Sequence, residues 1–175
     1  LYVGDMSRNK NLRNLLKGVS ILSTSRPVCL TIVGGSEKDA DKNGLHNAKG
    51  RDITRFIGRI EKESELREVY RAHDIFVMPS YTETFGIVYI EALSQGLPIV
   101  HSRGHGVDGL FKADTVSESA NPYDPSDIAS AISTLLERLK TDRAIPSLCI
   151  SESKRFNWRD ISKEYVEIYS GILRR

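Results

Sequence analysis

Short apolar runs that alternate with helical patterns constrain the fold of this chain most strongly. Each run has the length of a strand and the continuous hydrophobicity that is typical of strands buried in a parallel sheet. The runs cover 1–3, 28–33, 53–57, 74–78 and 98–101, with a shorter one at 115–117. Helical patterns cover 11–24, 37–48, 63–72, 85–95, 125–140, 144–155 and 159–173. The alternation predicts parallel βαβ units, and therefore an α/β fold on a doubly wound, Rossmann-like, six-stranded parallel sheet.

Length and composition indicate a single globular domain. The 175 residues contain no repeat and no low-complexity linker, so one domain spanning residues 1–175 is expected. The formal net charge of +2 favours neither a nucleic-acid partner nor an anionic membrane surface. No apolar run approaches the roughly 20 residues of a membrane-spanning helix. The chain starts inside a strand-like run without an initiator methionine, which indicates a piece of a longer protein.

The sequence offers no constellation of metal ligands. Cys29 and Cys149 lie in apolar patterns without metal-ligand spacing, so both are expected to be buried thiols in a reducing compartment. His46 and His73 have no evident partner in the pattern. No metal and no cofactor is therefore expected.

The stretch from Pro79 to Ala92 carries the strongest functional signal. It follows the strand-like run 74–78 and continues into the helical pattern 85–95, so it is a strand, a polar loop and a helix. The loop carries Glu83, and Glu91 follows after seven intervening residues. The first amides of a helix have no partner within the helix and attract anions. The stretch therefore predicts an anion site that is flanked by two carboxylates.

Topology brings a second loop to this stretch. In the common strand order 3-2-1-4-5-6, the first and fourth strands lie side by side, and ligands bind beyond their carboxyl ends. The loop after the first strand carries Arg8 and Lys10, and the loop after the fourth carries Glu83. We therefore expect two cations, a carboxylate and a helix N-terminus to meet in one crevice.

The residues of this crevice resemble those of a known enzyme family. The pattern Pro79-Ser80-x-x-Glu83-x-Phe85-Gly86-x-Val88-x-x-Glu91-Ala92 resembles the E-x7-E signature of the family 4 retaining glycosyltransferases, which have the GT-B fold. Further similar segments are Val3-Gly4 with Lys10, Ile32-Val33-Gly34-Gly35, Phe56-Ile57-Gly58, and Phe156-Asn157-Trp158 before the last helix. The resemblance spans nearly the whole chain. It departs at Asp5, where many members have arginine, and Arg8 on the same loop is a candidate replacement.

The resemblance implies a role for each residue of the crevice. Catalytic roles fall to Glu83, Lys10 and Arg8. Arg8 and Lys10, with the backbone amides of Ile87 and Val88, would bind the diphosphate of a nucleotide sugar. The donor sugar would be held by Glu83, Thr84, Phe85 and Gly86. Glu91 would bind the ribose, and Gly34, Gly58 and Arg59 would form the base pocket.

Two features outside this set stay open. His105 and Asp108, on the loop after the fifth strand, could contact an acceptor or could belong to a loop shaped by its glycines. Trp158 is expected to have a packing role.

The resemblance also implies which part of an enzyme this is. GT-B enzymes have two Rossmann-like domains, and this chain is similar to the C-terminal, donor-binding one, so the N-terminal domain is expected to be absent and the isolated fragment inactive. The implied reaction is retaining transfer of a hexosyl group to an acceptor hydroxyl in polysaccharide or glycolipid biosynthesis. The implied partners are a nucleotide-sugar donor and, through the N-terminal domain, an acceptor glycan or lipid-linked sugar. A cytoplasmic location is expected, with association at the inner face of the membrane left open.

Three alternatives remain at this stage. A catalytically silent nucleotide-sugar-binding module would need the same donor site. A nucleotide-sugar epimerase of the same fold would need further acid–base residues, and a phosphorylase would need a separate phosphate or pyridoxal phosphate site. The sequence leaves the base and sugar of the donor, the acceptor and the oligomeric state undetermined.

Overall fold

The computed structural model describes residues 1–112 and 115–173, and it has the expected α/β architecture. Its strands are β1 (Tyr2–Val3), β2 (Leu30–Val33), β3 (Thr54–Phe56), β4 (Phe76–Met78), β5 (Ile99–Ser102) and β6 (Ser117–Ala120). Its helices are α1 (Leu12–Ser23), α2 (Glu37–Lys42), α3 (Glu63–Arg71), α4 (Ile87–Ser94), α5 (Pro125–Thr141), α6 (Ile145–Ser153) and α7 (Trp158–Leu173). Short 3-10 turns are η1 (Arg8–Lys10), η2 (Arg51–Ile53) and η3 (Lys154–Phe156).

The strands form two parallel three-stranded halves that meet at β1 and β4. One half has the order β1-β2-β3 and the other β4-β5-β6. At the joint, the Val77 amide donates to the Leu1 carbonyl at 2.8 Å, and the buried amino group of Leu1 donates to the Ile75 carbonyl at 2.7 Å. The predicted order 3-2-1-4-5-6 is therefore present across the two halves, which these backbone hydrogen bonds join at β1 and β4. The carboxyl ends of β1 and β4 consequently open onto one crevice.

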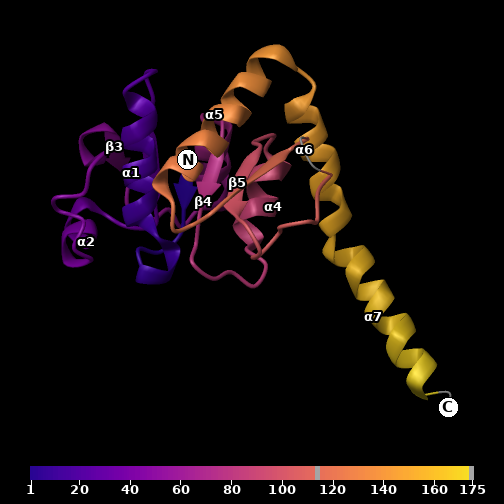
Figure 1. Ribbon diagram of the computed structural model, residues 1–175. Helices are drawn as coiled ribbons and strands as arrows, with labels where there is room; N and C mark the ends of the chain where they lie inside the picture. The colour runs from indigo at the N-terminus through magenta and orange to yellow at the C-terminus, as the bar shows by residue number, and fades with distance from the viewer. Residues whose placement is uncertain (113–114, 174–175) are drawn as a thin grey trace.

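Apolar strands and the inward faces of α1, α4, α5 and α6 build a single core. The strands β1, β2, β4 and β5 are buried along their whole length, as their continuous apolar character requires. Helix α1 packs against α5, and Gly18 allows this contact, because a Cβ there would lie 2.9 Å from the Pro125 carbonyl oxygen. Figure 1 shows α1 and α5 side by side over the joint between the sheets.

The structure corrects several details of the sequence analysis. The sixth strand is Ser117–Ala120 rather than 115–117, and α2 ends at Lys42 rather than near 48. Gly44, with a φ of 73°, follows the end of α2 in a left-handed conformation that a continuing helix does not allow. Cys29 is exposed, not buried, and it directly precedes the first residue of β2. Cys149 is buried as predicted, and burial raises the pKa of its thiol to about 12.

Helix α7 projects away from the body of the protein (Figure 1). In its first turn Ile161 is half-buried, but Trp158 is 72% exposed, so the packing role expected for Trp158 is wrong. The large apolar side chains farther along α7 are also exposed: Tyr165, Val166, Ile168, Tyr169, Ile172 and Leu173. Across the described residues, no helix combines the length and apolar character that crossing a bilayer requires.

Candidate donor-binding site

A cavity of about 670 Å³ lies where the carboxyl ends of β1 and β4 meet. The loop after β1 contributes Gly4, Asp5 and Lys10 to its lining. The loop after β4 and the start of α4 contribute the predicted residues Glu83, Thr84, Phe85, Gly86, Ile87 and Val88. Topology thus brings together most of the residues that sequence analysis selected. We call this cavity the donor pocket.

An ion pair links the two loops inside the donor pocket. The Lys10 ammonium donates to Glu83 Oε2 at 2.7 Å, and the two side chains are only 20% and 13% exposed. A partly buried, charge-assisted hydrogen bond of this kind is shorter and stronger than a neutral one. Lys10 and Glu83 are therefore held in place, each with its charged group available at the wall of the pocket.

The N-terminus of α4 supplies the anion site that the sequence predicts. Gly86 precedes the helix with a φ of 81°, and no side chain caps the helix. A Cβ at Gly86 would lie 2.5 Å from the Tyr89 ring, so both the backbone conformation and the space at this position require glycine. Ile87 and Val88, the first two residues of α4, line the pocket, and the first amides of a helix lack intrahelical partners.

Neighbouring loops fix the backbone around Glu83. The Gly106 amide donates to the Glu83 carbonyl at 2.9 Å. Asn9 makes a two-way contact with Thr82: its side-chain amide donates to the Thr82 carbonyl at 2.8 Å, and its oxygen accepts from the Thr82 amide at 3.1 Å. The Tyr81 amide donates to the Asn9 carbonyl at 2.8 Å. The loop that carries Glu83 is thus held from both sides, as a preorganised site requires.

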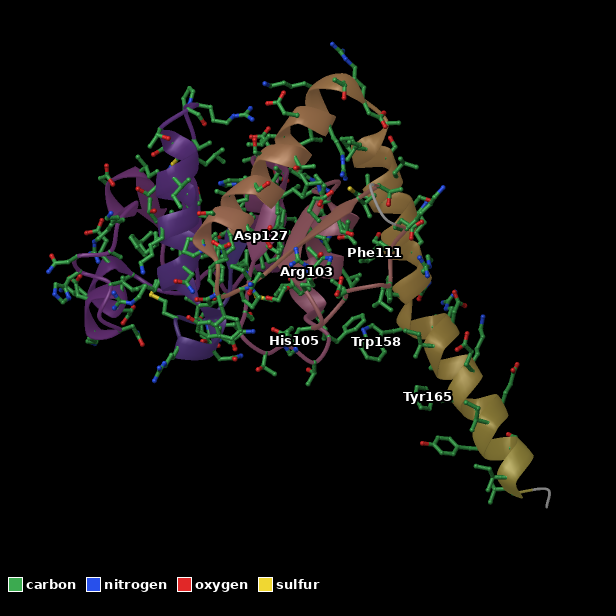
Figure 2. The ribbon with its side chains drawn as sticks, in the orientation of Figure 1. Arg103, His105, Phe111, Asp127, Trp158 and Tyr165 are labelled. Atoms are coloured by element: carbon green, nitrogen blue, oxygen red, sulfur yellow. The ribbon has the colours of Figure 1, made fainter. Side chains whose placement is uncertain are left out.

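An apolar wall closes the side of the donor pocket that faces α7. Phe85 lies against Phe156 with ring centroids 5.6 Å apart, and Phe156 lies against Phe111 at 5.9 Å. Trp158 and Ile161, from the first turn of α7, complete the wall, and Figure 2 shows Trp158 at the base of the projecting helix. Sequence analysis did not place Phe156, Trp158 or Ile161 in the site. The available signal was the Phe156-Asn157-Trp158 segment, which could be singled out only by its resemblance to the family.

Asp5 adds a second carboxylate to the donor pocket. Hydrogen bonds from the side chain and backbone of Ser7 hold the pKa of Asp5 below its usual value, so Asp5 is ionised at neutral pH. Among the described residues that line the pocket, one cation, Lys10, thus faces two carboxylates, Asp5 and Glu83. The positive partial charge at the N-terminus of α4 offsets part of this excess of negative charge.

Arg8 lies outside the donor pocket. Its side chain lines a second cavity on the other side of η1, together with Arg13 and Tyr81. Lys10 and Arg8 therefore point into different cavities, although only one residue separates them. The reason is the tight 3-10 turn, which the sequence did not predict. The predicted contact of Arg8 with the diphosphate stays a prediction.

Glu91 lies near the donor pocket but does not line it. It is exposed on α4, and the Tyr70 hydroxyl donates to Glu91 Oε2 at 3.0 Å. This bond orients the carboxylate toward α3. The predicted ribose contact of Glu91 stays a prediction.

The three residues predicted for the base pocket lie at the ends of β2 and β3. The Gly34 amide donates to the Gly58 carbonyl at 2.7 Å, and a Cβ at Gly34 would lie 2.1 Å from the Gly4 carbonyl oxygen. Gly34 thus has a packing role that lets β1 and β2 end side by side. A Cβ at Gly58 would meet nothing within 4 Å, and Arg59 is exposed. Their contact with a base stays a prediction.

Asp108, which the sequence analysis left open, organises the loop after β5. Asp108 Oδ2 accepts from the Gly104 amide at 2.6 Å, and Oδ1 lies 3.9 Å from Nδ1 of buried His101. The same loop carries Gly106, which holds Glu83. His105 is half-buried on this loop (Figure 2). Over the part of the chain that the structure describes, no group of three or more histidine, cysteine or acidic side chains is poised to bind a metal ion.

Known proteins are similar to this chain in sequence and in fold. Residues 1–146 match the family described as "Glycosyl transferases group 1". The D-inositol 3-phosphate glycosyltransferase of Corynebacterium kroppenstedtii is 29% identical over 99% of this chain and 40% of its own length. The sulfoquinovosyl transferase SQD2 of Arabidopsis thaliana is 35% identical over 59% of this chain and 21% of its own length. The chain thus spans less than half the length of these relatives.

Solved structures support the same family. Sucrose-phosphate synthase from Thermosynechococcus elongatus matches 98% of this chain and 44% of its own with a TM-score of 0.79 and 25% identity. Anabaena HepE, solved with UDP and glucose, matches 97% of this chain and 47% of its own with a TM-score of 0.76, and at 21% identity it shows a shared fold. The chain belongs to the group 1 glycosyltransferases, and its fold is that of the C-terminal domain of a GT-B glycosyltransferase.

Proposed function

We propose that the donor pocket binds a nucleotide diphosphate sugar and that the enzyme transfers the sugar, with retained anomeric configuration, to an acceptor hydroxyl. The ion pair of Lys10 and Glu83 beside the open N-terminus of α4 carries this proposal. In this proposal the Lys10 cation and the free amides of α4 bind the diphosphate, and the Glu83 carboxylate binds the sugar. Anabaena HepE, which shares the fold, was solved with UDP-glucose, so UDP-sugars are the first donors to test.

Each group has a role in the proposed reaction. The bond between the anomeric carbon and the diphosphate oxygen breaks, and the acceptor oxygen bonds to that carbon while its proton passes to the leaving phosphate. Lys10 and the amides of Ile87 and Val88 stabilise the negative charge that grows on the leaving diphosphate. Glu83 accepts hydrogen bonds from sugar hydroxyls and stabilises positive charge at the anomeric carbon. No metal ion is needed in this scheme.

The rest of the nucleotide would lie along the edge of the sheet. Glu91, oriented by Tyr70, would accept hydrogen bonds from the ribose hydroxyls. The base would lie near Gly34, Gly58 and Arg59, at the ends of β2 and β3. The acceptor, a glycan or lipid-linked sugar, would be held largely by a further domain, since the relatives are more than twice as long as this chain.

Titration of the chain with UDP, GDP and ADP, each with and without a sugar, tests the proposal. We expect one nucleotide to bind and Lys10→Ala to weaken it about 10- to 100-fold, because a charge-assisted hydrogen bond contributes roughly 1.5–3 kcal/mol. Lys17→Ala, at an exposed position on α1, is the matched control and should change nothing. Absence of binding by all three nucleotides, or wild-type affinity in Lys10→Ala, would contradict the proposal.

Activity separates a transferase from a silent binding module. In an enzyme with both domains, Glu83→Gln should lower transfer by orders of magnitude while the protein stays folded, with a lower melting temperature because the ion pair with Lys10 is lost. Wild-type rates in this variant would reject the role of Glu83. Consumption of the donor without any acceptor would instead indicate an epimerase.

A further inference from the structure

The second cavity, on the opposite side of η1 from the donor pocket, has a volume of about 410 Å³. Its polar lining comes from four segments: Ser7 and Arg8 in the loop after β1, Asn11 and Arg13 at the start of α1, Asn43 at the end of α2, and Tyr81 in the loop after β4. Its floor is apolar, from buried Leu12 and Leu45. We call it the arginine cavity.

The arginine cavity is positively charged. Arg8 and Arg13 line it, and among the described residues that form its lining there is no carboxylate. None of the three acidic residues of neighbouring α2 lines the cavity, and two of them are engaged elsewhere, because Asp39 bonds with Ser36 and Asp41 pairs with Arg51. The Arg13 guanidinium donates to the Gly44 carbonyl at 2.6 Å, which fixes its position. Two guanidinium groups in a concave site favour a phosphate or carboxylate.

An immobilised aromatic ring forms one wall of the arginine cavity. Tyr81 stacks on Tyr123 with ring centroids 5.0 Å apart and an interplanar angle of 30°. Its hydroxyl accepts from the Asn14 side chain at 3.2 Å, and its amide is held by Asn9. A fixed ring beside polar groups suits a carbohydrate, because one face of a sugar ring presents C–H groups to the aromatic surface while the hydroxyls bond to the rim.

The arginine cavity and the donor pocket share their dividing wall. Arg8 and Lys10 are two residues apart in η1 and enter the two different cavities. Tyr81 and Glu83 are likewise two residues apart and also separate into the two cavities. A molecule in the arginine cavity would therefore lie next to the donor pocket, because residues of the same two loops line both cavities.

We infer that the arginine cavity binds an anionic carbohydrate, with its phosphate or carboxylate on Arg8 and Arg13 and its ring against Tyr81. The binding of an anionic sugar in the arginine cavity does not depend on the proposed function of the donor pocket.

Nuclear magnetic resonance titration of the chain tests the inference, because amide signals report where a ligand binds. The probes are glucose 6-phosphate, glucuronate, glucose, inorganic phosphate and UDP. We expect glucose 6-phosphate or glucuronate to shift the amide signals of Ser7, Arg13 and Tyr81, and UDP to shift those of Gly86 and Ile87. Arg13→Ala should weaken binding of the anionic sugar at least tenfold and leave UDP affinity within twofold. Arg143→Ala, at an exposed arginine elsewhere, is the matched control.

The result with each probe has a definite meaning. Stronger binding of glucose 6-phosphate than of glucuronate would identify a phosphate as the anionic group, and the reverse a carboxylate. Equal binding of glucose and both anionic sugars would overturn the charge requirement. Binding of inorganic phosphate as tight as that of glucose 6-phosphate would mean an adventitious ion only, and a Tyr81→Leu variant with wild-type affinity would overturn the stacking contact.

The outcome for the donor pocket is separate. Binding of UDP without any anionic sugar would overturn this inference and leave the proposed function intact. Binding of an anionic sugar without any nucleotide would reject the proposed function and support the arginine cavity.

Discussion

The Lys10 ammonium and the Glu83 carboxylate lie 2.7 Å apart across the donor pocket, although 73 positions separate them in sequence. The pair links the loops after β1 and β4 and leaves the pocket without an unpaired cation in the part of the chain that the structure describes. A diphosphate that enters the pocket must therefore compete with Glu83 for Lys10. In the proposed reaction, Glu83 is therefore both a ligand for the sugar and a competitor of the phosphates for Lys10.

Glu83→Gln should separate these two effects. Without the carboxylate, Lys10 is free for phosphate, so we expect UDP to bind several-fold more tightly, while the additional affinity of a UDP-sugar over UDP is lost. Isothermal titration calorimetry with both ligands measures the two affinities. Glu65→Gln is a matched control, because it removes a carboxylate from a surface pair with Lys62 at 2.9 Å and should change neither. Weaker binding of UDP in Glu83→Gln would contradict the competition.

Asp5→Asn should strengthen binding of the nucleotide diphosphate. Asp5 is ionised and lines the pocket, where it repels the phosphates through water-exposed space. Removal of one such charge should raise UDP affinity about two- to fivefold, corresponding to roughly 0.4–1 kcal/mol. The gain should shrink as the salt concentration rises, because salt screens the repulsion. Asp52→Asn, at an exposed position in η2, is the control, and an unchanged affinity in Asp5→Asn would place the phosphates away from Asp5.

Sequence reasoning could predict the fold and the centre of the site because both follow from periodicity and topology. Alternating apolar runs and helices specify parallel βαβ units, and the switch between β1 and β4 then brings Lys10 to Glu83. Gly86 was readable as well, because a glycine before a helix without a capping side chain allows a ligand to approach the backbone.

The direction of individual side chains could not be read in the same way. Arg8 and Lys10 differ by two positions, and only the geometry of η1 sends them into separate cavities. Glu91 faces Tyr70, which belongs to another helix, so its orientation depends on a tertiary contact. The wall formed by Phe156 and Trp158 was missed for the same reason, since its residues come from the far end of the chain and carry no local signal.

Gly106→Ala should disturb the sugar-binding part of the site more than the diphosphate part. Gly106 has a φ of 62°, and an added Cβ would lie 3.1 Å from the Phe85 carbonyl oxygen and 3.3 Å from Glu83 Cγ. We expect a loss of stability of about 1–3 kcal/mol from the left-handed backbone conformation, together with a reduced preference for UDP-sugar over UDP.

Gly109→Ala is the control for Gly106→Ala. Gly109 has a φ of 77°, but a Cβ there would meet nothing within 4 Å, so it carries the backbone cost without the contact. Thermal unfolding and the two titrations measure the effects. An equal loss of sugar preference in both variants would show that Gly106 does not act through its contact with Glu83.

The free energy of unfolding should fall with decreasing pH in a way that depends on His101. This side chain is 3% exposed, and burial lowers its pKa, although the Ser102 carbonyl and Asp108 oppose the effect. In the unfolded chain His101 takes up a proton near pH 6.5, whereas in the folded chain it does so only at lower pH. The contribution of His101 to the free energy of unfolding is therefore fully present above about pH 6.5 and is lost as the pH falls below that value. His73, whose pKa is also lowered by burial, adds to the slope.

Urea unfolding between pH 8 and pH 5 should therefore give a shallower pH dependence in His101→Gln than in the wild type, whereas His46→Gln, at an exposed position, should keep the wild-type slope. Equal slopes in all three proteins would show that His101 takes up its proton as readily in the folded protein as in the unfolded chain.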